Sequence, residues 1–183
     1  MSDPADRIYE RLMVLRCQAG DEAAFGELVE RYGPRLRYFL RKMLREPGAA
    51  EDALQEVWLD VYRALPRLAD PGALAAWLYR IARSAAYRAL RRRRQPHVPL
   101  EEAQEAEAPA EDDAFSAEDA ARIHAALEWL APEHREVLVL RFLEDMSYDD
   151  VARVTGCALG TVKSRLYHAK RALRRALGEG KQA

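Results

Sequence analysis

Apolar residues recur every three or four positions through most of the chain, the spacing that places them on one face of an α-helix. In the first half this pattern predicts a short helix before Gly20 and a helix starting at Asp21 that bends or restarts at Gly33-Pro34. Two more helices follow at about 49–65 and 74–94, separated by a loop over 66–73. In the second half it predicts helices at about 117–130, 133–143, 147–155 and 158–177. The predicted fold class is therefore all-α.

The same periodicity predicts which side chains face the interior. For the helices of the first half these are Phe25, Leu28, Val29 and Tyr32, then Leu54, Val57, Trp58, Val61, Tyr62 and Leu65, then Trp77, Leu78, Ile81, Ala85 and Leu90. For the last helix they are Leu159, Val162, Leu166, Ala169 and Leu173. Helix-end signals agree with these boundaries, because Asp21 and Ser147 suit N-caps, Pro132 suits a first turn and Gly156 suits a left-handed helix end.

Composition changes sharply in the middle of the chain. After the run RRRR at 91–94, residues 95–119 hold three prolines and a dense acidic run but no Lys or Arg. A segment of this kind buries little apolar surface. We predict two small helical domains, at 1–94 and 118–183, joined by a flexible acidic linker at 95–117. The linker is either a solvating tether or an acidic strand that follows a basic channel on a partner.

Charge is segregated along the chain although the totals nearly cancel, with 29 Lys and Arg against 30 Asp and Glu. Residues 31–45 and 80–94 are basic, the middle is acidic, and residues 155–177 hold six Lys and Arg with no acid. A near-zero net charge hides this arrangement. Basic segments at both ends favour a polyanion as partner.

Several classes of function are excluded by the same composition. The N-terminus lacks the basic and apolar regions of a signal peptide, and no apolar run approaches the ~18 residues of a membrane span. Cys17 and Cys157 lie far apart and the four His show no ligand spacing with them, so we expect no disulfide framework, metal or cofactor. No nucleophile–base set, paired carboxylates or phosphate loop stands out. We therefore expect a cytoplasmic protein that is not an enzyme and has no small-molecule substrate.

The last two predicted helices, with the tight turn at Gly156, have the form of a helix-turn-helix. In that motif the N-terminal part of the second helix enters the major groove, where base edges differ in donors and acceptors. Side chains off its apolar stripe divide into two sets. We predict base readers at Lys163, Ser164, Tyr167 and His168, and phosphate contacts at Thr161, Arg165, Arg171 and Arg174. The alternative is a basic amphipathic helix with a solvated face.

The stretch MSYDDVARVTGCALGTVKSRLYHAKRAL resembles the C-terminal DNA-reading domain of bacterial extracytoplasmic-function (ECF) sigma factors, group 4 of the sigma-70 family. AEDALQEVWLDVYRAL and AWLYRIARSAAYRALRRR resemble the two core helices of their N-terminal domain. The resemblance covers nearly the whole chain in the same order. It implies a promoter-specificity subunit that binds core RNA polymerase, reads the double-stranded −35 element, captures the melted single strand at −10 and initiates transcription. It also implies an anti-sigma factor as partner and favours the channel interpretation of the linker.

The resemblance carries over to particular positions. Polymerase docking falls on Asp52, Gln55 and Glu56, polar residues that we expect on the outward side of their helix. The loop that holds a flipped −10 base falls on Leu68, Ala69 and Asp70. The remaining contacts to the single DNA strand at −10, here called strand contacts, are expected where basic groups alternate with aromatics, a pattern that suits single-stranded DNA. These residues are Arg80, Arg83, Ser84, Tyr87, Arg88 and Arg91.

This chain departs from the family pattern at several positions. Leu68 and Ala69 replace an aromatic and a basic residue, and Ser84 stands where Asn is common. His168 stands where Arg is frequent, which would change the −35 preference. We interpret Trp77 as a core residue rather than a stacking platform, and Cys157 as a packing residue rather than a redox switch.

Two other functions are consistent with parts of this pattern. A sigma-like decoy could sequester an anti-sigma factor without directing transcription, and only the atypical loop at 68–70 favours it. A repressor or activator of the helix-turn-helix type would need a ligand or dimer domain in place of the first domain.

Overall fold

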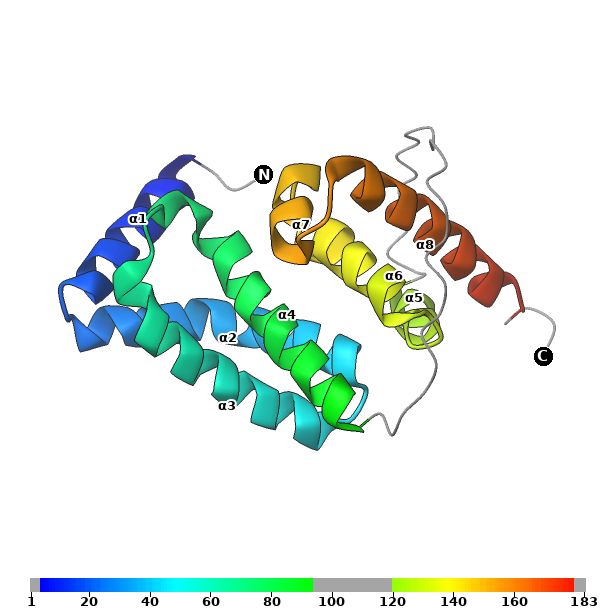
Figure 1. Cartoon of the computed structure of the whole chain (residues 1–183), viewed down its shortest axis with the longest axis horizontal. Coiled ribbons are helices and arrows are strands. Elements are labelled where there is room, and N and C mark those ends of the chain that lie inside the picture. Colours follow the sequence, from blue (N-terminus) through cyan, green and yellow to red (C-terminus); the bar gives the residue numbers. More distant parts are fainter. Residues whose placement is uncertain (1–3, 94–119, 180–183) are drawn as a thin grey trace. The chain divides into compact units, whose positions relative to one another are not determined.

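The computed structural model describes residues 4–93 and 120–179, and all regular structure there is helical. Figure 1 shows the helices in chain order. They are α1 (Pro4–Gln18), α2 (Glu22–Leu44), α3 (Pro47–Ala64), α4 (Leu74–Arg93), α5 (Ala120–Leu127), α6 (Pro132–Leu138), α7 (Tyr148–Thr155) and α8 (Leu159–Glu179), with the short turns η1 (Leu65–Arg67), η2 (Pro71–Ala73) and η4 (Val139–Leu143). The prediction of an all-α protein is confirmed.

The chain divides into two compact units, the first holding α1 to α4 and the second holding α5, α6, α8 and most of α7. The predicted linker at 95–117 lies outside the described residues, as does the predicted start of a helix at 117–119. No described helix is long and apolar enough to cross a membrane.

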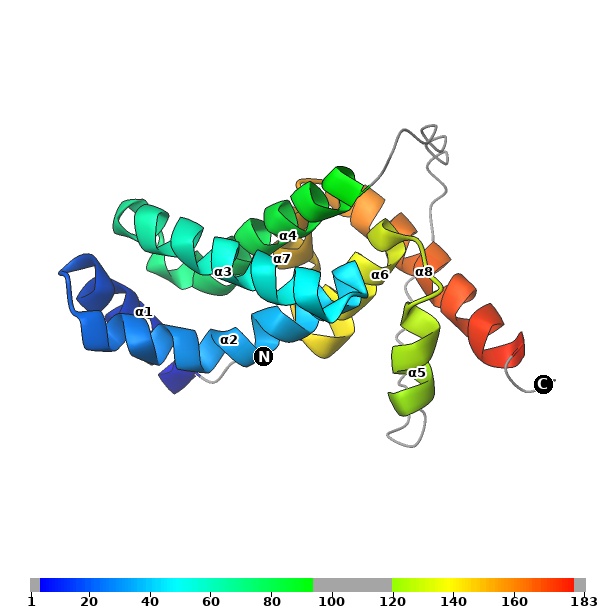
Figure 2. The same ribbon diagram turned by 90° about the horizontal axis from the view of Figure 1, so that it is seen from below.

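In the first unit, α2, α3 and α4 pack side by side and α1 packs on α2 and on the turns η1 and η2 (Figures 1 and 2). Several residues predicted to face inward are buried in the core, namely Leu28, Tyr32, Leu54, Val57, Val61, Leu65, Leu78 and Ala85. Others are only half-buried, namely Phe25, Val29, Trp58, Trp77, Ile81 and Leu90. Phe39 of α2 meets Tyr79 of α4 edge to face, with ring centroids 5.5 Å apart, and both side chains are fully buried. Such aromatic pairs stabilise a core beyond the area that they bury.

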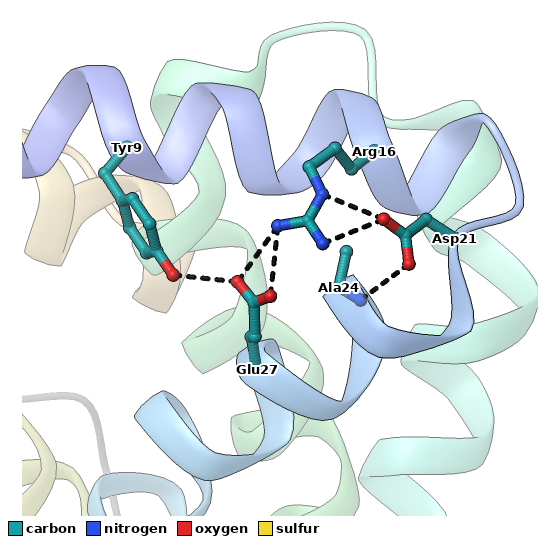
Figure 3. A network of polar contacts seen from close by, with 5 residues as sticks. All are labelled: Tyr9, Arg16, Asp21, Ala24 and Glu27. Carbon is teal, nitrogen blue, oxygen red and sulfur yellow. Dashed lines mark hydrogen bonds and ion pairs between the residues drawn. The ribbon is translucent and has the colours of Figure 1, made fainter.

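The junction of α1 and α2 is held by a polar network that Figure 3 shows. Asp21 caps α2 by accepting a hydrogen bond from the Ala24 amide, as predicted, and it also pairs with Arg16 of α1. Arg16 reaches Glu27 as well, and the Tyr9 hydroxyl donates to Glu27 at 2.8 Å. The hydrogen bond from Tyr9, with that from Arg16, lowers the pKa of Glu27. This network holds the end of α1 against the first turns of α2.

The sequence predicts that the helix bends or restarts at Gly33-Pro34. The helix α2 runs without interruption through these residues, so the restart is wrong. Proline inside a helix removes one backbone donor and normally kinks or breaks it. Here Leu28, Tyr32 and Leu36 are fully buried on both sides of the proline. The packing of this long apolar face outweighs the local preference for a break.

Two predicted core residues are exposed. Tyr62 is 63% exposed, and its ring rests on the edge of Phe25 with centroids 5.3 Å apart. Leu159 is 40% exposed because it is the first residue of α8 and precedes the turn that packs on the unit. The rest of the α8 stripe is buried as predicted, at Val162, Leu166, Ala169 and Leu173.

In the second unit, α8 packs on α5 and α6. Arg135 of α6 is only 2% exposed, and its guanidinium donates to the carbonyls of Leu127, Glu128 and Leu130 at 2.8, 3.3 and 2.7 Å. These carbonyls belong to the last residue of α5 and the turn that follows it, where acceptors lack intrahelical partners. One buried side chain therefore closes the end of α5, which stops at residue 127 rather than at the predicted 130.

Candidate nucleic-acid and polymerase interfaces

The predicted helix-turn-helix is formed by α7 and α8. The Ser147 hydroxyl accepts from the Asp150 amide at 3.1 Å and donates to the Asp150 carboxylate at 2.7 Å, which confirms the predicted start of α7. Gly156 ends the helix at φ 70°, the left-handed conformation that glycine adopts without strain. These caps set where α8 begins.

The predicted base readers lie on the outer side of α8. Lys163 is exposed, while Ser164, Tyr167 and His168 are half-buried. The rings of Tyr167 and His168 meet edge to face at 5.4 Å, and the Arg171 guanidinium lies 5.6 Å from the centre of the Tyr167 ring. The aromatic groups therefore hold one another in place beside the exposed Lys163.

The residues predicted to contact DNA phosphates differ in their exposure and in their contacts. Arg171 and Arg174 are exposed, and Thr161 is half-buried. Arg165 is half-buried and donates from Nη1 to the Cys157 sulfur at 3.0 Å. The turn cysteine thus contacts a basic side chain of α8.

The predicted loop at 66–73 consists of the two 3₁₀ turns η1 and η2, with Leu68, Ala69 and Asp70 between them. Asp70 accepts a hydrogen bond from the Gly72 amide at 2.8 Å and so caps η2. Gln18 of α1 donates to the carbonyls of Leu65 and Leu68 at 3.1 and 2.9 Å. The sequence analysis missed Gln18, because a side-chain bond to a backbone carbonyl 47 or 50 residues away leaves no local pattern.

Beside this loop, a groove of about 460 Å³ lies between α3 and α4. It contains three of the predicted strand contacts, Arg80, Ser84 and Arg88. Its other lining residues are Asp60, Arg63, Ala64, Arg67, Trp77 and Ile81. Arg63, near the end of α3, and Arg67, in η1, were not predicted, because their common face depends on the turn that follows α3. The groove is mostly basic, with Trp77 in its wall.

The remaining predicted strand contacts lie elsewhere on α4. The Arg83 guanidinium lies 4.6 Å from the centre of the Tyr87 ring, and Arg91 is exposed. The Ser84 hydroxyl donates to the carbonyl of Arg80 at 3.0 Å, within the same helix. The three basic residues Arg80, Arg83 and Arg91 are thus presented by one rigid helix.

The predicted docking residues share a second groove of about 460 Å³, lined by Ala49, Asp52, Ala53, Gln55, Glu56, Leu59, Ala89 and Arg92. Asp52 and Gln55 are exposed, as expected for outward positions. Glu56 differs, because its carboxylate accepts from Arg92 at 2.9 Å and from Arg88 at 3.4 Å. The hydrogen bond from Arg92 is the main contact that lowers the Glu56 pKa.

Arg88 joins the two predicted sites. It lies 3.4 Å from Glu56 and 3.1 Å from Asp60, so a predicted strand contact is paired with a predicted docking residue. The sequence analysis assigned them to separate roles. The structure places both in one ion-pair network across α3 and α4.

Comparison with known proteins gives matches in both units. Residues 28–95 match the family Sigma-70 region 2, and residues 120–173 match the family Sigma-70, region 4. The chain is 35% identical to the RNA polymerase sigma-H factor of Pseudomonas aeruginosa, over 92% of this chain and 93% of that protein. It is 30% identical to the ECF RNA polymerase sigma-E factor of Escherichia coli, over 92% of this chain and 94% of that protein.

Two solved structures are also similar. CnrH in complex with the cytosolic domain of CnrY matches with a TM-score of 0.70 and 26% identity, over 93% of this chain and 97% of that one. The sigma factor RpoE from Bartonella quintana, in complex with the anti-sigma factor NepR, matches with a TM-score of 0.65 and 26% identity, over 84% of this chain and 96% of that one.

Proposed function

Because the chain belongs to the ECF sigma factors of the sigma-70 family, we propose that its two units divide the reading of one promoter between them. A sigma factor is the promoter-specificity subunit that binds core RNA polymerase, reads the −35 and −10 elements and initiates transcription. It regulates transcription, and in our proposal it supplies no catalytic group of its own. Polymerase and promoter lie in the bacterial cytoplasm, which is where we expect this protein to act.

The second unit, residues 118–183, reads the −35 element in this proposal. Lys163 and Tyr167 meet base edges, and Arg171 and Arg174 meet phosphates on either side of the groove. The single observation that carries the proposal is the helix-turn-helix, in which a capped α7 and the left-handed Gly156 present the outer face of α8. Base contacts supply sequence preference, and phosphate contacts fix the orientation of the helix.

The first unit, residues 1–94, captures the −10 strand and docks on the polymerase. The groove with Arg80 and Arg88 supplies cations for the strand. Trp77, which the sequence analysis interprets as a core residue, is half-buried in the wall of this groove and would offer its ring to a base there. Stacking on an aromatic ring contributes about 1–3 kcal/mol per base in single-strand binding. Asp52, Gln55 and Glu56 on α3 form the docking surface.

The partners in this proposal are core RNA polymerase, promoter DNA and an anti-sigma factor. Two similar structures hold a sigma factor or CnrH with a second protein bound, which supports the expectation of an anti-sigma factor. The curated relatives carry sigma-factor names, and this does not favour the decoy.

The test is a transcription assay with core RNA polymerase, the full chain and fragmented genomic DNA of the source organism, followed by mapping of transcript starts. We expect starts that share one −35/−10 pair. Lys163→Ala should alter the shared −35 sequence, whereas Arg174→Ala should lower the yield of all starts. Binding to polymerase or an anti-sigma protein without any starts would contradict the promoter role and support the decoy.

A further inference from the structure

The helix α1 contacts both turns of the loop at 66–73. The half-buried Gln18 donates from Nε2 to the carbonyls of Leu65 and Leu68, at 3.1 and 2.9 Å. The Leu65 carbonyl also accepts from the Leu68 amide at 3.0 Å, the hydrogen bond that closes η1. One side chain of α1 therefore holds the first turn of the loop at the point where α3 ends.

Arg11 lies against the second turn. It precedes Gln18 by about two helical turns, so both side chains leave the same face of α1. A side-chain carbon on Gly72 would lie 3.0 Å from Nη2 and 3.3 Å from Nε of Arg11, and 3.1 Å from Oδ1 of Asp70. These distances are shorter than ordinary van der Waals contact. The guanidinium and the carboxylate therefore occupy the space that a larger residue at position 72 would need.

The absence of a side chain at Gly72 serves this contact rather than the backbone. Among the described glycines, only Gly20 and Gly156 have a positive φ. The Gly72 amide donates to Oδ1 of Asp70 at 2.8 Å, and the Ala73 amide donates to the Asp70 carbonyl at 3.0 Å. Arg11 thus packs on a turn that Asp70 closes.

The helix that carries Arg11 and Gln18 is itself fixed to α2. Val14 is fully buried, and the Tyr32 hydroxyl donates to Glu10 at 2.6 Å. Arg16 reaches Glu27 of α2 at 3.0 Å, in the network of Figure 3. The helix α1 therefore forms a rigid support, on which the two turns of the loop rest.

The loop has few means of holding its own shape. Leu68 and Ala69 have no polar group in their side chains. Asp70 has one, but its hydrogen bond lies within the second turn. The path of the chain from one turn to the other therefore depends on the two contacts with α1.

We propose that Arg11 and Gln18 are positioning residues for the base-holding loop, and that Gly72 provides the space for Arg11. The inference rests on the proposed function, in which this loop takes a base out of the −10 strand. A flipped base is read in a closely fitting pocket, and a loop that is already in place need not be ordered on binding. Neither side chain touches DNA in this proposal. Both precede residue 28, where the match to Sigma-70 region 2 begins.

Hydrogen exchange of the full chain tests the two contacts without DNA. Arg11→Gln should speed exchange of the Gly72 amide by about two- to tenfold, as the loss of one contact of ordinary strength would. Gln18→Ala should do the same for the Leu68 amide. Arg45→Gln is the matched control for Arg11→Gln, because it removes the same charge from an exposed residue at the end of α2, and it should leave both amides unchanged.

Binding of single-stranded DNA tests the consequence for reading a base. The full chain is mixed with a labelled pool of random strands of about 12 nucleotides, and the bound strands are sequenced. Arg11→Gln should weaken the preference for one base by about two- to tenfold, with little change in affinity for the whole pool. Arg80→Gln, which removes a proposed cation of the groove, should lower the affinity and keep the preference. This split separates a positioning residue from a phosphate contact.

Gly72→Ala gives a second readout that keeps the charge of Arg11. Its methyl group should displace the guanidinium and so weaken the base preference as Arg11→Gln does. In the double variant the two effects should not add, because the shorter Gln side chain leaves room for the methyl group. Additive effects would mean that Gly72 acts independently of Arg11, which would overturn the pairing.

Three further results would overturn the proposal. They are unchanged exchange at Gly72 in Arg11→Gln, faster exchange throughout the first unit in that variant, and faster exchange in the loop with an unchanged base preference. A wild-type chain that binds the pool with no base preference would contradict the proposed −10 role of the loop itself. The exchange rates would then still decide whether α1 holds the loop, so the two failures are distinguishable.

Discussion

Glu56 of α3 and Arg92 of α4 are joined by a hydrogen bond of 2.9 Å, and Arg88, one turn earlier on α4, reaches the same carboxylate at 3.4 Å. The proposed docking surface and the basic helix of the first unit therefore share a charged contact. A substitution at Glu56 changes both, whereas a substitution at the neighbouring Gln55 changes the docking surface alone.

Gln55→Ala is expected to weaken binding to core RNA polymerase by about tenfold, equivalent to about 1.4 kcal/mol, without changing the thermal stability of the chain. The reason is that Gln55 is exposed and lines the docking groove. Glu56→Gln should weaken polymerase binding and also lower stability slightly, by the ~0.2–1 kcal/mol of a partly exposed ion pair. Titration with labelled protein measures the first effect and thermal unfolding the second. Equal destabilisation by both variants would assign Gln55 a structural role instead.

Lys163→Ala should relax the preference for bases in the −35 element at a cost of about 1–3 kcal/mol, because Lys163 is the exposed residue of the proposed base-reading set. Arg174→Ala should weaken binding to all sequences about equally and reduce the slope of log affinity against log salt by about one. Competition binding of the holoenzyme to promoter variants at several salt concentrations separates the two effects. If Lys163→Ala behaves like Arg174→Ala, Lys163 is a phosphate contact.

Gln18→Ala should slow the opening of the −10 region and leave −35 recognition unchanged. Gln18 donates to two carbonyls of the segment that leads into the −10 loop, and each such bond contributes about 0.5–1.5 kcal/mol. Fluorescence of a base analogue placed at −10 reports the opening rate. Gln18→Glu is the matched comparison, since it keeps the size of the side chain but has no amide donor, and it should slow opening as much. An unchanged rate in both variants would mean that the loop needs no anchor on α1.

The second unit is expected to lose stability as the pH falls below neutral because of His134 of α6. Burial lowers the pKa of His134, so the unfolded chain takes up a proton near the ordinary value of about 6.5 while the folded chain does not. The free energy of unfolding is therefore greatest above pH 7 and falls as the pH is lowered through about 6.5 towards the folded pKa. His134→Gln should flatten this slope in chemical unfolding measured between about pH 5 and 8. A slope that persists in the variant would assign the effect to another group.

Much of the fold follows from the sequence because helix formation depends on local signals. The spacing of Leu78 and Ala85 indicates the buried face of α4, and the start of that helix at Leu74 is observed as predicted. Ser147 and Gly156 similarly fix the boundaries of α7. These signals lie within a few residues of the feature that they specify.

The features that the sequence did not predict depend on contacts between segments that are distant in the chain. Helical spacing placed Tyr62 inward, but its ring contacts Phe25 at one side only and is 63% exposed. The continuous α2 at Pro34 depends on burial against α3 and α4, which the local sequence does not record. The pairing of Arg88 with Glu56 and Asp60 arises only when α3 and α4 lie side by side. The candidate site residues could be proposed from sequence, but their mutual connections could not.

The buried Arg135 also sets an order of events during synthesis of the chain. The helix α5 has eight residues, fewer than the ~12–15 that an isolated helix needs in water, and its closing donor lies on the following helix. While the nascent chain emerges, α5 must stay uncapped until residue 135 has left the ribosome. The four helices of the first unit all precede residue 135 in the chain, so they leave the ribosome before α5 can be capped.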